Sequence, residues 1–273
     1  PPLPQMIGQG GFAKVYKCDY AGQTAVAKVI DSSRLNEEMT YLLTNECTIW
    51  AKLAHPNIVS FFGMCTDTNP PAVMLVCELL PDGALQDRLE KLRKSGAAPP
   101  KELEIVGQLQ QIAKGMDYLH GMEPHPVLHR DLKSANILLT DGGKRLAIAD
   151  FGLARYQANA GKKMTAETGS YRWMAPEVIR HEEYDKRCDV YSFAILAWEM
   201  LTYRIPFDNL MPVEAAFAVA REAKRPPIPE AYHTRPIAEM LNACWHQASE
   251  KRPEFPTITK ALEEEIEILQ QEQ

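Results

Sequence analysis

Hydrophobic residues recur along the chain with two spacings, and the change between them falls near residue 84. Before that point, short runs alternate apolar and polar positions or are apolar throughout, and polar turns separate them. Such runs are typical of β-strands. They cover residues 12–19, 24–30, 61–65 and 73–77, and with a strand ahead of the first run they predict a five-stranded antiparallel sheet.

Helical spacing interrupts the sheet once and then dominates the rest of the chain. Residues 35–53 carry apolar side chains three or four positions apart without an internal Pro or Gly, which predicts one large helix. The same spacing returns in residues 85–94, 103–119 and 189–201. We therefore predict an α+β protein, with the sheet and one helix in the first part and mostly helices in the second.

The last helical stretch begins near Ile258. It places apolar residues on one face and its glutamates, Glu265 among them, mostly on the other faces. This pattern predicts a final helix packed on the domain. A coiled coil that binds a partner is the alternative, but the stretch contains few turns for one.

Composition narrows the class of protein. The chain has 273 residues, enough for one large domain or two lobes. Its hydrophobic content of 45% and charged content of 24% are ordinary for a globular protein. A net charge of −6 gives no general basic surface, so nucleic acid and anionic membranes are not expected as main partners. No apolar run reaches the ~18 residues that a transmembrane helix needs.

Cysteine usage and the first residues bear on the compartment. The six cysteines are scattered, with no CxxC pair and no clustered histidines. Zinc binding and a disulfide framework are therefore unsupported, and a reducing compartment, the cytoplasm, is expected. The chain opens PPLP, without an initiator Met or the regions of a secretory signal, so we expect a domain from a longer protein.

Two polar motifs follow one another in the second part of the chain. Residues 129–136 read HRDLKSAN, and a strand-like run, residues 145–149, leads into DFG at residues 150–152. Together they resemble the catalytic loop and the magnesium-binding turn of a protein kinase. The alternative is a polar loop in which Asp131 and Asn136 merely form turns.

The resemblance implies a role for each polar side chain in phosphoryl transfer, a reaction that mainly needs positioning and charge neutralisation. Asp131 would accept or orient the proton of the attacking substrate hydroxyl. Lys133 would steady the migrating phosphate. Asn136 and Asp150 would supply the oxygen ligands that Mg²⁺ prefers.

A glycine-rich turn, IGQGGFAKV, occupies residues 7–15. Gly8, Gly10 and Gly11 would let the backbone approach the phosphates of ATP. Ala13 stands where the third glycine of the pattern is usual, which is a mild departure. A dinucleotide-binding fold is the alternative, but there the turn opens a helix, whereas the residues after this turn alternate as a strand does.

Lys28 ends the sequence AVAK on the strand that follows. The resemblance implies that Lys28 bridges the α- and β-phosphates of ATP and pairs with a glutamate on the large helix. Glu46 is the expected partner, because it precedes the HPNIV turn at residues 55–59. A solvated lysine and a surface carboxylate are the alternatives. The pair would be an on/off element, since a helix that swings away would separate it.

The resemblance also implies a hinge at residues 78–83, between an N-lobe of residues 1–77 and a C-lobe of residues 84–273. Backbone groups of Glu78 and Leu80 would meet the adenine edge. The apolar walls of the ATP site would be formed by Ile7, Val15, Ala27 and Leu138.

Cys77 falls at the position that guards the pocket behind the adenine. It would admit bulky ligands there, and its thiol is a candidate reactive group. The alternative is a small hydrophobic residue buried at the end of a strand, which is where free cysteine usually lies.

The segment that ends in APE narrows the resemblance. Residues 169–177 read GSYRWMAPE, and with Lys133 in the catalytic loop they resemble the tyrosine-kinase-like group of serine/threonine kinases, its Raf-like and mixed-lineage branches above all. Ser170 would bond Lys133 and Asp131, an arrangement associated with Ser/Thr acceptors. Dual specificity is the alternative, because the group contains such members.

Regulation is expected in the same segment. Arginine in the position of Arg130 commonly pairs with a phosphorylated residue of this segment and orders it. We predict Thr165 or Thr168 as the phosphosite, modified by an upstream kinase or by autophosphorylation. The alternative is that both threonines form turn hydrogen bonds only.

Two further contacts are expected in the C-lobe. Asp189 should accept hydrogen bonds from the backbone of the catalytic loop, and Arg252 should pair with Glu177. The sequence as a whole predicts an ATP- and Mg²⁺-dependent Ser/Thr kinase that acts on protein substrates. A pseudokinase scaffold is the alternative from another class, and a homodimer formed through the first lobe remains open.

Overall fold

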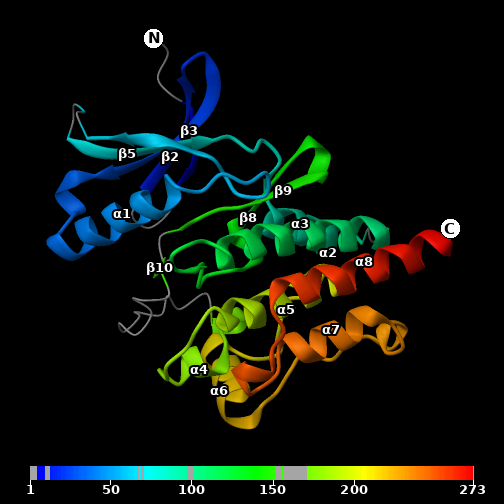
Figure 1. Cartoon of the computed structure of the whole chain (residues 1–273). Helices are drawn as coiled ribbons and strands as arrows, with labels where there is room; N and C mark the ends of the chain where they lie inside the picture. Colours follow the sequence, from blue (N-terminus) through cyan, green and yellow to red (C-terminus); the bar gives the residue numbers. More distant parts are fainter. Residues whose placement is uncertain are drawn as a thin grey trace.

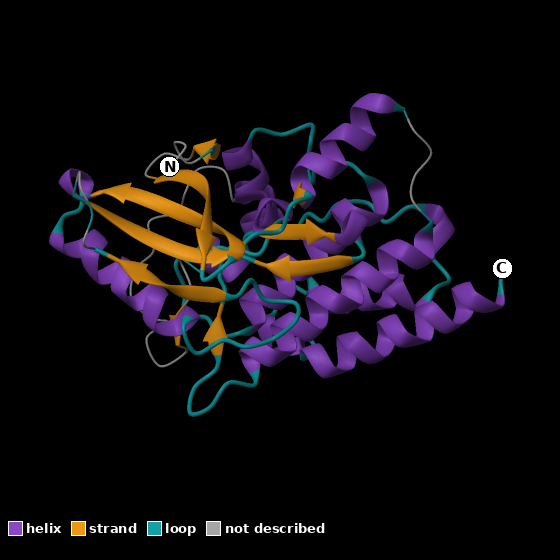
Figure 2. Ribbon diagram, turned by 90° about the horizontal axis from the view of Figure 1, so that it is seen from above, coloured by secondary structure: helices purple, strands orange, loops and turns teal. Residues whose placement is uncertain are grey.

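A computed structural model of the chain describes residues 5–9, 13–66, 68, 71–96, 101–151, 155–156 and 171–272. A five-stranded antiparallel sheet with one helix lies at one end of the molecule, and most helices gather at the other (Figure 1, Figure 2). This arrangement confirms the predicted two-lobed α+β fold.

The N-lobe sheet has the order β1-β2-β3-β5-β4. On its central strand, β3, Ala25 and Ala27 are buried on one face, two positions apart, and Ile30 is buried on the opposite face. The strands are β1 (Met6–Gln9), β2 (Ala13–Tyr20), β3 (Gln23–Asp31), β4 (Phe61–Cys65) and β5 (Ala72–Glu78).

The one large helix of this lobe is α1, Glu37–Trp50. Asn36 caps its start, since its side-chain oxygen accepts a hydrogen bond from the backbone N–H of Met39 at 2.8 Å. The helix packs on the sheet through Cys47, which joins Val73 and Leu75 of β5 in a small buried cluster. The predicted helix over 35–53 is thus confirmed with tighter ends.

Helices form most of the C-lobe. They are α2 (Leu85–Ser95), α3 (Glu102–His120), α4 (Pro176–Ile179), α5 (Arg187–Thr202), α6 (Pro212–Glu222), α7 (Pro236–Cys244) and α8 (Phe255–Gln271). Short strands lie between the lobes and carry the catalytic segments. They are β6 (Gly83–Ala84), β7 (Val127–Leu128), β8 (Ile137–Thr140), β9 (Arg145–Ile148) and β10 (Arg155–Tyr156), with β8 between β6 and β9 in one sheet.

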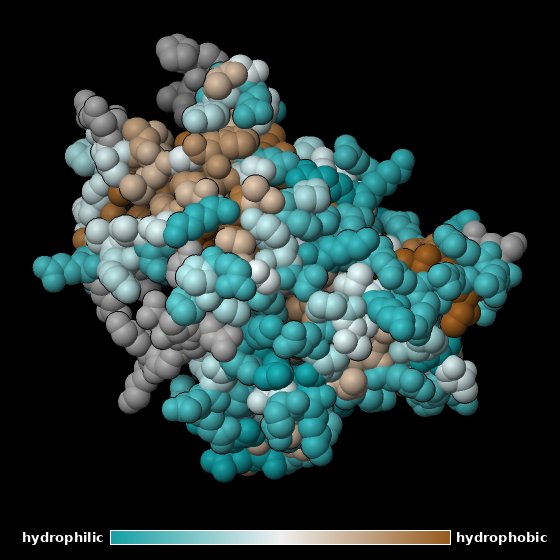
Figure 3. Space-filling model, in the orientation of Figure 1, coloured by the Kyte–Doolittle hydropathy of each residue, from teal (hydrophilic) through white to brown (hydrophobic). Residues whose placement is uncertain are grey.

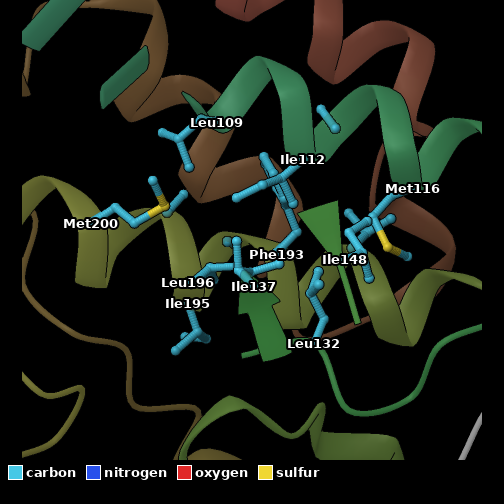
Figure 4. Packing of buried hydrophobic residues seen from close by; sticks show 14 of the residues in the cluster. Leu109, Ile112, Met116, Leu132, Ile137, Ile148, Phe193, Ile195, Leu196 and Met200 are labelled. Carbon is cyan, nitrogen blue, oxygen red and sulfur yellow. The ribbon is translucent and has the colours of Figure 1, made fainter. Parts of the chain in front are cut away.

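The main core forms around α5, which is mostly apolar and is buried on all sides from Cys188 to Leu201. Figure 4 shows apolar side chains of α3 and α5 meeting those of Leu132, Ile137 and Ile148. Leu132 lies within the HRDLKSAN motif, Ile137 directly follows it and Ile148 lies two residues before the DFG motif. Each of the three is at most 1% exposed. The core therefore anchors the polar loops of the predicted site.

The final helix, α8, packs against α3 and α7 as predicted. One detail of that prediction is wrong, because Glu265 is 1% exposed and lies inside. Its carboxylate is 2.5 Å from Arg235, and its other oxygen accepts a hydrogen bond from the backbone N–H of Ile237. The partly buried guanidinium of Arg235 offsets the cost of burying this carboxylate on the inner face.

Surface hydropathy differs between the lobes. On the face in Figure 3, brown hydrophobic surface gathers over the strand lobe, while teal hydrophilic surface covers most of the helical lobe. Among the described helices, none is both long enough and apolar enough to cross a membrane.

Candidate active site

Lys28, Glu46 and Asp150 come together from three elements. Lys28 lies on β3, Glu46 on α1, and Asp150 two residues after the end of β9. The Lys28 Nζ is 4.0 Å from Glu46 Oε1 and 3.6 Å from Asp150 Oδ1. The expected partner of Lys28 is therefore in reach, and α1 lies close to the sheet rather than swung away.

The charges of this triad stabilise one another. Burial opposes the charged form of Lys28, but Asp150 and Glu46 outweigh it and raise the pKa of the ammonium above its ordinary value. Burial also raises the pKa of Glu46, which is 5% exposed, while Lys28 acts in the opposite direction. Lys28 is thus held as a cation between two acids.

Aromatic rings from three segments pack around Phe151 of the DFG motif. Phe151 is fully buried, with its ring 5.8 Å from Trp50 of α1 and 5.4 Å from His129 of the catalytic loop. Trp50 in turn stacks on Phe61 of β4 at 4.9 Å. Because Phe151 points into these rings, the adjacent Asp150 faces Lys28. The same rings link α1, β4 and the catalytic loop.

The catalytic loop is fixed from below by Asp189 of α5. Its buried carboxylate accepts hydrogen bonds from the backbone N–H groups of His129 at 2.9 Å and Arg130 at 2.7 Å. The ring of His120 lies 3.0 Å from the same carboxylate. This confirms the predicted contact. It also explains how Arg130 keeps a φ of 72°, a strained value for a residue with a side chain.

Three polar side chains converge within the loop. Lys133 Nζ donates to Asp131 Oδ2 at 2.7 Å, and Asn136 Nδ2 donates to the same oxygen at 3.0 Å. Asn136 also donates to the backbone oxygen of Asp131 at 2.8 Å. With its amide nitrogen engaged, the side-chain oxygen of Asn136 is left for a cation.

The donor set fits magnesium. Asn136 offers an amide oxygen and Asp150 offers a carboxylate whose side chain is 47% exposed. Within the described residues no cluster of three or more His, Cys, Asp or Glu side chains could hold a metal by itself. One or two protein oxygens, completed by phosphate and water, are what Mg²⁺ usually takes in phosphoryl-transfer sites.

The predicted walls of the nucleotide site lie on adjacent strands. Gly8 of β1 pairs with Val15 of β2, and Val15 pairs with Lys28 of β3. Ala27, 6% exposed, lies on the buried side of β3. From the other lobe, Leu138 of β8 pairs with Ala84 directly after the predicted hinge. Ile7 lies on β1 and is 45% exposed.

The predicted hinge residues meet two different environments. The side chain of Leu80 is buried. The carboxylate of Glu78 forms an ion pair with Arg145, 2.5 Å from its Nη1.

Burial raises the pKa of the half-buried Cys77 thiol to about 12. The second interpretation of Cys77, an inert buried side chain, is therefore favoured over a reactive thiol.

Comparison with known proteins shows which family the chain resembles. The family model of protein tyrosine and serine/threonine kinases matches residues 3–262.

The chain belongs to the protein kinase family.

Relatives cover nearly all of the kinase domain. Serine/threonine-protein kinase STY46 of Arabidopsis thaliana is 39% identical over 258 residues, which are 94% of this chain and 43% of that protein. Mitogen-activated protein kinase kinase kinase 10 of Homo sapiens is 39% identical over 273 residues, 96% of this chain and 27% of that protein. Serine/threonine-protein kinase CTR1 of Arabidopsis thaliana is 37% identical over 95% of this chain and 31% of its own length.

These relatives confirm the resemblance to the tyrosine-kinase-like group. The kinase chain spans less than half the length of STY46 and of the related STY17, 43% and 44%.

Several predicted positions lie outside the described residues. They are Gly10 and Gly11 of the glycine turn, Ser170, and the predicted phosphosites Thr165 and Thr168. Beyond them, the segment resumes at Tyr171 and runs into Glu177, whose carboxylate forms a bidentate ion pair with Arg252 at 2.6 and 2.7 Å. This pair was predicted and is confirmed.

Sequence reasoning missed two sets of residues. The sequence places Trp50 in the predicted helix over 35–53 and Phe61 in the predicted strand over 61–65, without indicating a contact with the site. The spacing of four residues between Glu46 and Trp50 is the signal that both lie on one face of α1. Arg145 was treated as part of a strand. Arg145 pairs with Glu78, and its Nε donates to the backbone oxygen of Pro56 at 2.9 Å. No local sequence pattern predicted these contacts.

Proposed function

We propose that this domain transfers the γ-phosphate of ATP to serine or threonine hydroxyls of protein substrates. The observation that carries the proposal is that Lys28 lies close to both Glu46 and Asp150, while Lys133 and Asn136 both donate to the carboxylate of Asp131. The printed names of the relatives support the Ser/Thr preference. One relative, HT1 of Arabidopsis thaliana, is named a serine/threonine/tyrosine-protein kinase and is 35% identical, so dual specificity is the second candidate.

Each residue has a part in the proposed reaction. Asp131 acts as base toward the attacking hydroxyl, and its second contact, from Asn136, keeps the carboxylate oriented. Lys133, 2.7 Å from Asp131, is placed to meet the transferred phosphate. Lys28 binds the α- and β-phosphates, with Glu46 and Asp150 holding its ammonium. Mg²⁺, when bound through Asn136 and Asp150, supplies charge neutralisation for the phosphates.

The nucleotide site extends along the proposed hinge. We assign the adenine to backbone groups of Glu78 and Leu80, with Val15, Ala27 and Leu138 as the apolar walls. Ile7, Gly8, Gly10, Gly11 and Cys77 complete the ATP-binding set. In one kinase domain, residues 1–77 would form the N-lobe, residues 78–83 the hinge and residues 84–273 the C-lobe.

Partners and regulation stay part of the proposal. Phosphorylation of Thr165 or Thr168 by an upstream kinase, or in cis, would present a phosphate to Arg130. Protein substrates and a cytoplasmic location follow from the proposed activity and the cysteine pattern. A homodimer through the N-lobe remains an open alternative.

The direct test compares the wild type with Asp131→Asn. Both are incubated with Mg·ATP and a general protein substrate, and phosphorylated residues are identified by mass spectrometry. Transfer to serine or threonine in the wild type should fall at least about a hundred-fold in the variant, because the base is lost. Asp208→Asn, at an exposed ion pair with Arg204, is the matched control and should retain activity.

Two outcomes would change the proposal. Transfer to tyrosine as well would make the enzyme dual-specific. Measurable ATP binding without transfer by the wild type, even after treatment with an upstream kinase, would favour a pseudokinase scaffold.

A further inference from the structure

A buried acid beneath the catalytic loop is not used by the reaction described above. Glu199 of α5 is 2% exposed. Its Oε1 accepts a hydrogen bond from the Ser134 hydroxyl at 3.0 Å, and its Oε2 accepts one from the Trp173 indole N–H at 3.2 Å. The Nη1 of Arg93, from α2, lies 3.9 Å from Oε1.

These contacts connect segments that must keep their relative positions. Ser134 follows Lys133 and lies two residues before Asn136, so it belongs to the loop that carries the proposed base. Trp173 lies just before Ala175 and Pro176, and its backbone oxygen accepts a hydrogen bond from Ser192 of α5 at 2.8 Å. One carboxylate on the core helix therefore spans the catalytic loop and the end of the neighbouring segment.

We propose that Glu199 is a positioning residue for phosphoryl transfer. By accepting from Ser134 and Trp173 at once, its ionised carboxylate holds the catalytic loop against the segment that leads into Glu177. This role rests on the proposed function and adds a residue that no recognised motif contains.

Protonation of Glu199 changes the direction of one hydrogen bond. An indole N–H can only donate, so Oε2 must stay an acceptor, and a proton added to the carboxylate would lie on Oε1. The Ser134 hydroxyl would then have to accept where it now donates. Burial raises the pKa of Glu199 to about 7, against the hydrogen bonds and the cation that lower it. The two states therefore exchange near neutral pH.

Among the charged groups described around Glu199, Arg93 faces its carboxylate, and the others named below are engaged with other partners. Arg93 is the cation that faces it from α2. In the catalytic loop, Asp131 and Lys133 pair with each other at 2.7 Å. Next to Trp173, the Arg172 guanidinium is turned to the backbone oxygens of Pro206 and Leu210.

The substitution Glu199→Gln tests the proposal because an amide reproduces the protonated state. Its oxygen can accept from Trp173 while its nitrogen donates to Ser134. At about pH 8, where the wild type is ionised, kcat with a general protein substrate should be lower in the variant by about ten-fold, roughly the value of one hydrogen bond to a charged group. At about pH 6 the two kcat values should converge, and the KM for ATP should be unchanged throughout.

Glu265→Gln is the matched control. Glu265 is also a buried acid, 1% exposed, whose pKa burial raises, and it pairs with an arginine, Arg235, far from the catalytic loop. Its replacement should alter thermal stability and leave kcat equal to that of the wild type at each pH. A merely structural role for Glu199 would give the same result as this control.

Ser134→Ala supplies a second route to the answer if Glu199→Gln folds poorly. It should lower kcat at about pH 8, and when combined with Glu199→Gln it should cause no further loss, since both changes remove one interaction. A kcat ratio of wild type to Glu199→Gln that does not vary with pH, or additive losses in the double variant, would overturn the proposal. An inactive wild type would instead overturn the proposed function.

Discussion

Lys28 shows how a few ångströms decide the chemistry of a side chain. Its side chain is 35% exposed, and its ammonium lies between Asp150 and Glu46. Burial acts against the charge, but the two acids raise the pKa of Lys28. Glu46 is buried more deeply than Lys28, and within the hydrogen bonds of the described structure its Oε1 has no donor. Lys28 therefore stabilises the ionised form of Glu46, and Glu46 in turn orients the ammonium of Lys28.

Removing that charge tests the pair. Glu46→Gln should lower kcat by about ten-fold or more, because Lys28 would be drawn toward Asp150 and away from the phosphates. ATP binding, measured by calorimetry, should weaken less than kcat falls. Glu37→Gln, an exposed glutamate on the same helix, should match the wild type. Equal activity of both variants would show that the pair does not position Lys28.

At the scale of elements, Arg145 joins segments of both lobes. It begins β9, forms a bidentate ion pair with Glu78 at the end of β5, and donates to the backbone oxygen of Pro56 after α1. Burial alone would raise the pKa of Glu78, but hydrogen bonds from Arg145 and Ser60 hold it below its ordinary value. The ion pair thus stabilises the strand end that enters the hinge.

Arg145→Met should therefore destabilise the domain by about 1–3 kcal/mol at neutral pH, the range for hydrogen bonds to charged groups. A lowered carboxyl pKa contributes stability above the unfolded pKa, and the contribution is lost as the pH falls through the folded value. The difference between wild type and variant, measured by urea unfolding, should thus shrink in acid.

Lys94→Met is the control for that measurement, because its pair with Glu90 is exposed on α2. Replacing Lys94 should therefore change the unfolding free energy much less than Arg145→Met does, because exposed ion pairs contribute little to stability. An Arg145→Met effect as small as the control, or one that persists unchanged in acid, would contradict this account.

At the scale of the whole molecule, the ion pair of Glu177 and Arg252 connects the end of the proposed activation segment to the region before α8. Glu177 is 4% exposed and Arg252 3% exposed, and the two residues are 75 positions apart in the chain. Arg252 also donates to the backbone oxygen of Arg187 at the start of α5. The segment is thereby fastened to the core helix.

Arg252→Met should cost about 3–5 kcal/mol of unfolding free energy, because it leaves Glu177 buried without its cation. The double variant Arg252→Met/Glu177→Met should be more stable than Arg252→Met alone, since it removes the stranded charge. Urea unfolding of the three proteins measures both differences. A double variant as unstable as Arg252→Met would show that packing, and not the buried charge, causes the loss.

The sequence by itself determined the sheet, the large helices and the family. Periods of two and of three to four residues are set by backbone geometry, so the strands around Lys28 and the helix that carries Glu46 could be read directly. The motifs at residues 129–136 and 150–152 are local, because phosphoryl transfer needs these residue types at short separations. The contacts of Asp189 and the pair of Glu177 with Arg252 are long-range, and they were predicted from the resemblance to the kinase family.

Only the tertiary structure decided the distant contacts that no motif implied. Ser134 and Glu199 are 65 positions apart, and Arg145 and Glu78 are 67 apart. Nothing in the local pattern distinguishes Glu199 or Glu265 from a solvated glutamate, because burial depends on how helices pack and on which cation arrives from another segment. The hydrophobic pattern specifies the elements, whereas the position of each buried charge is set by the assembled core.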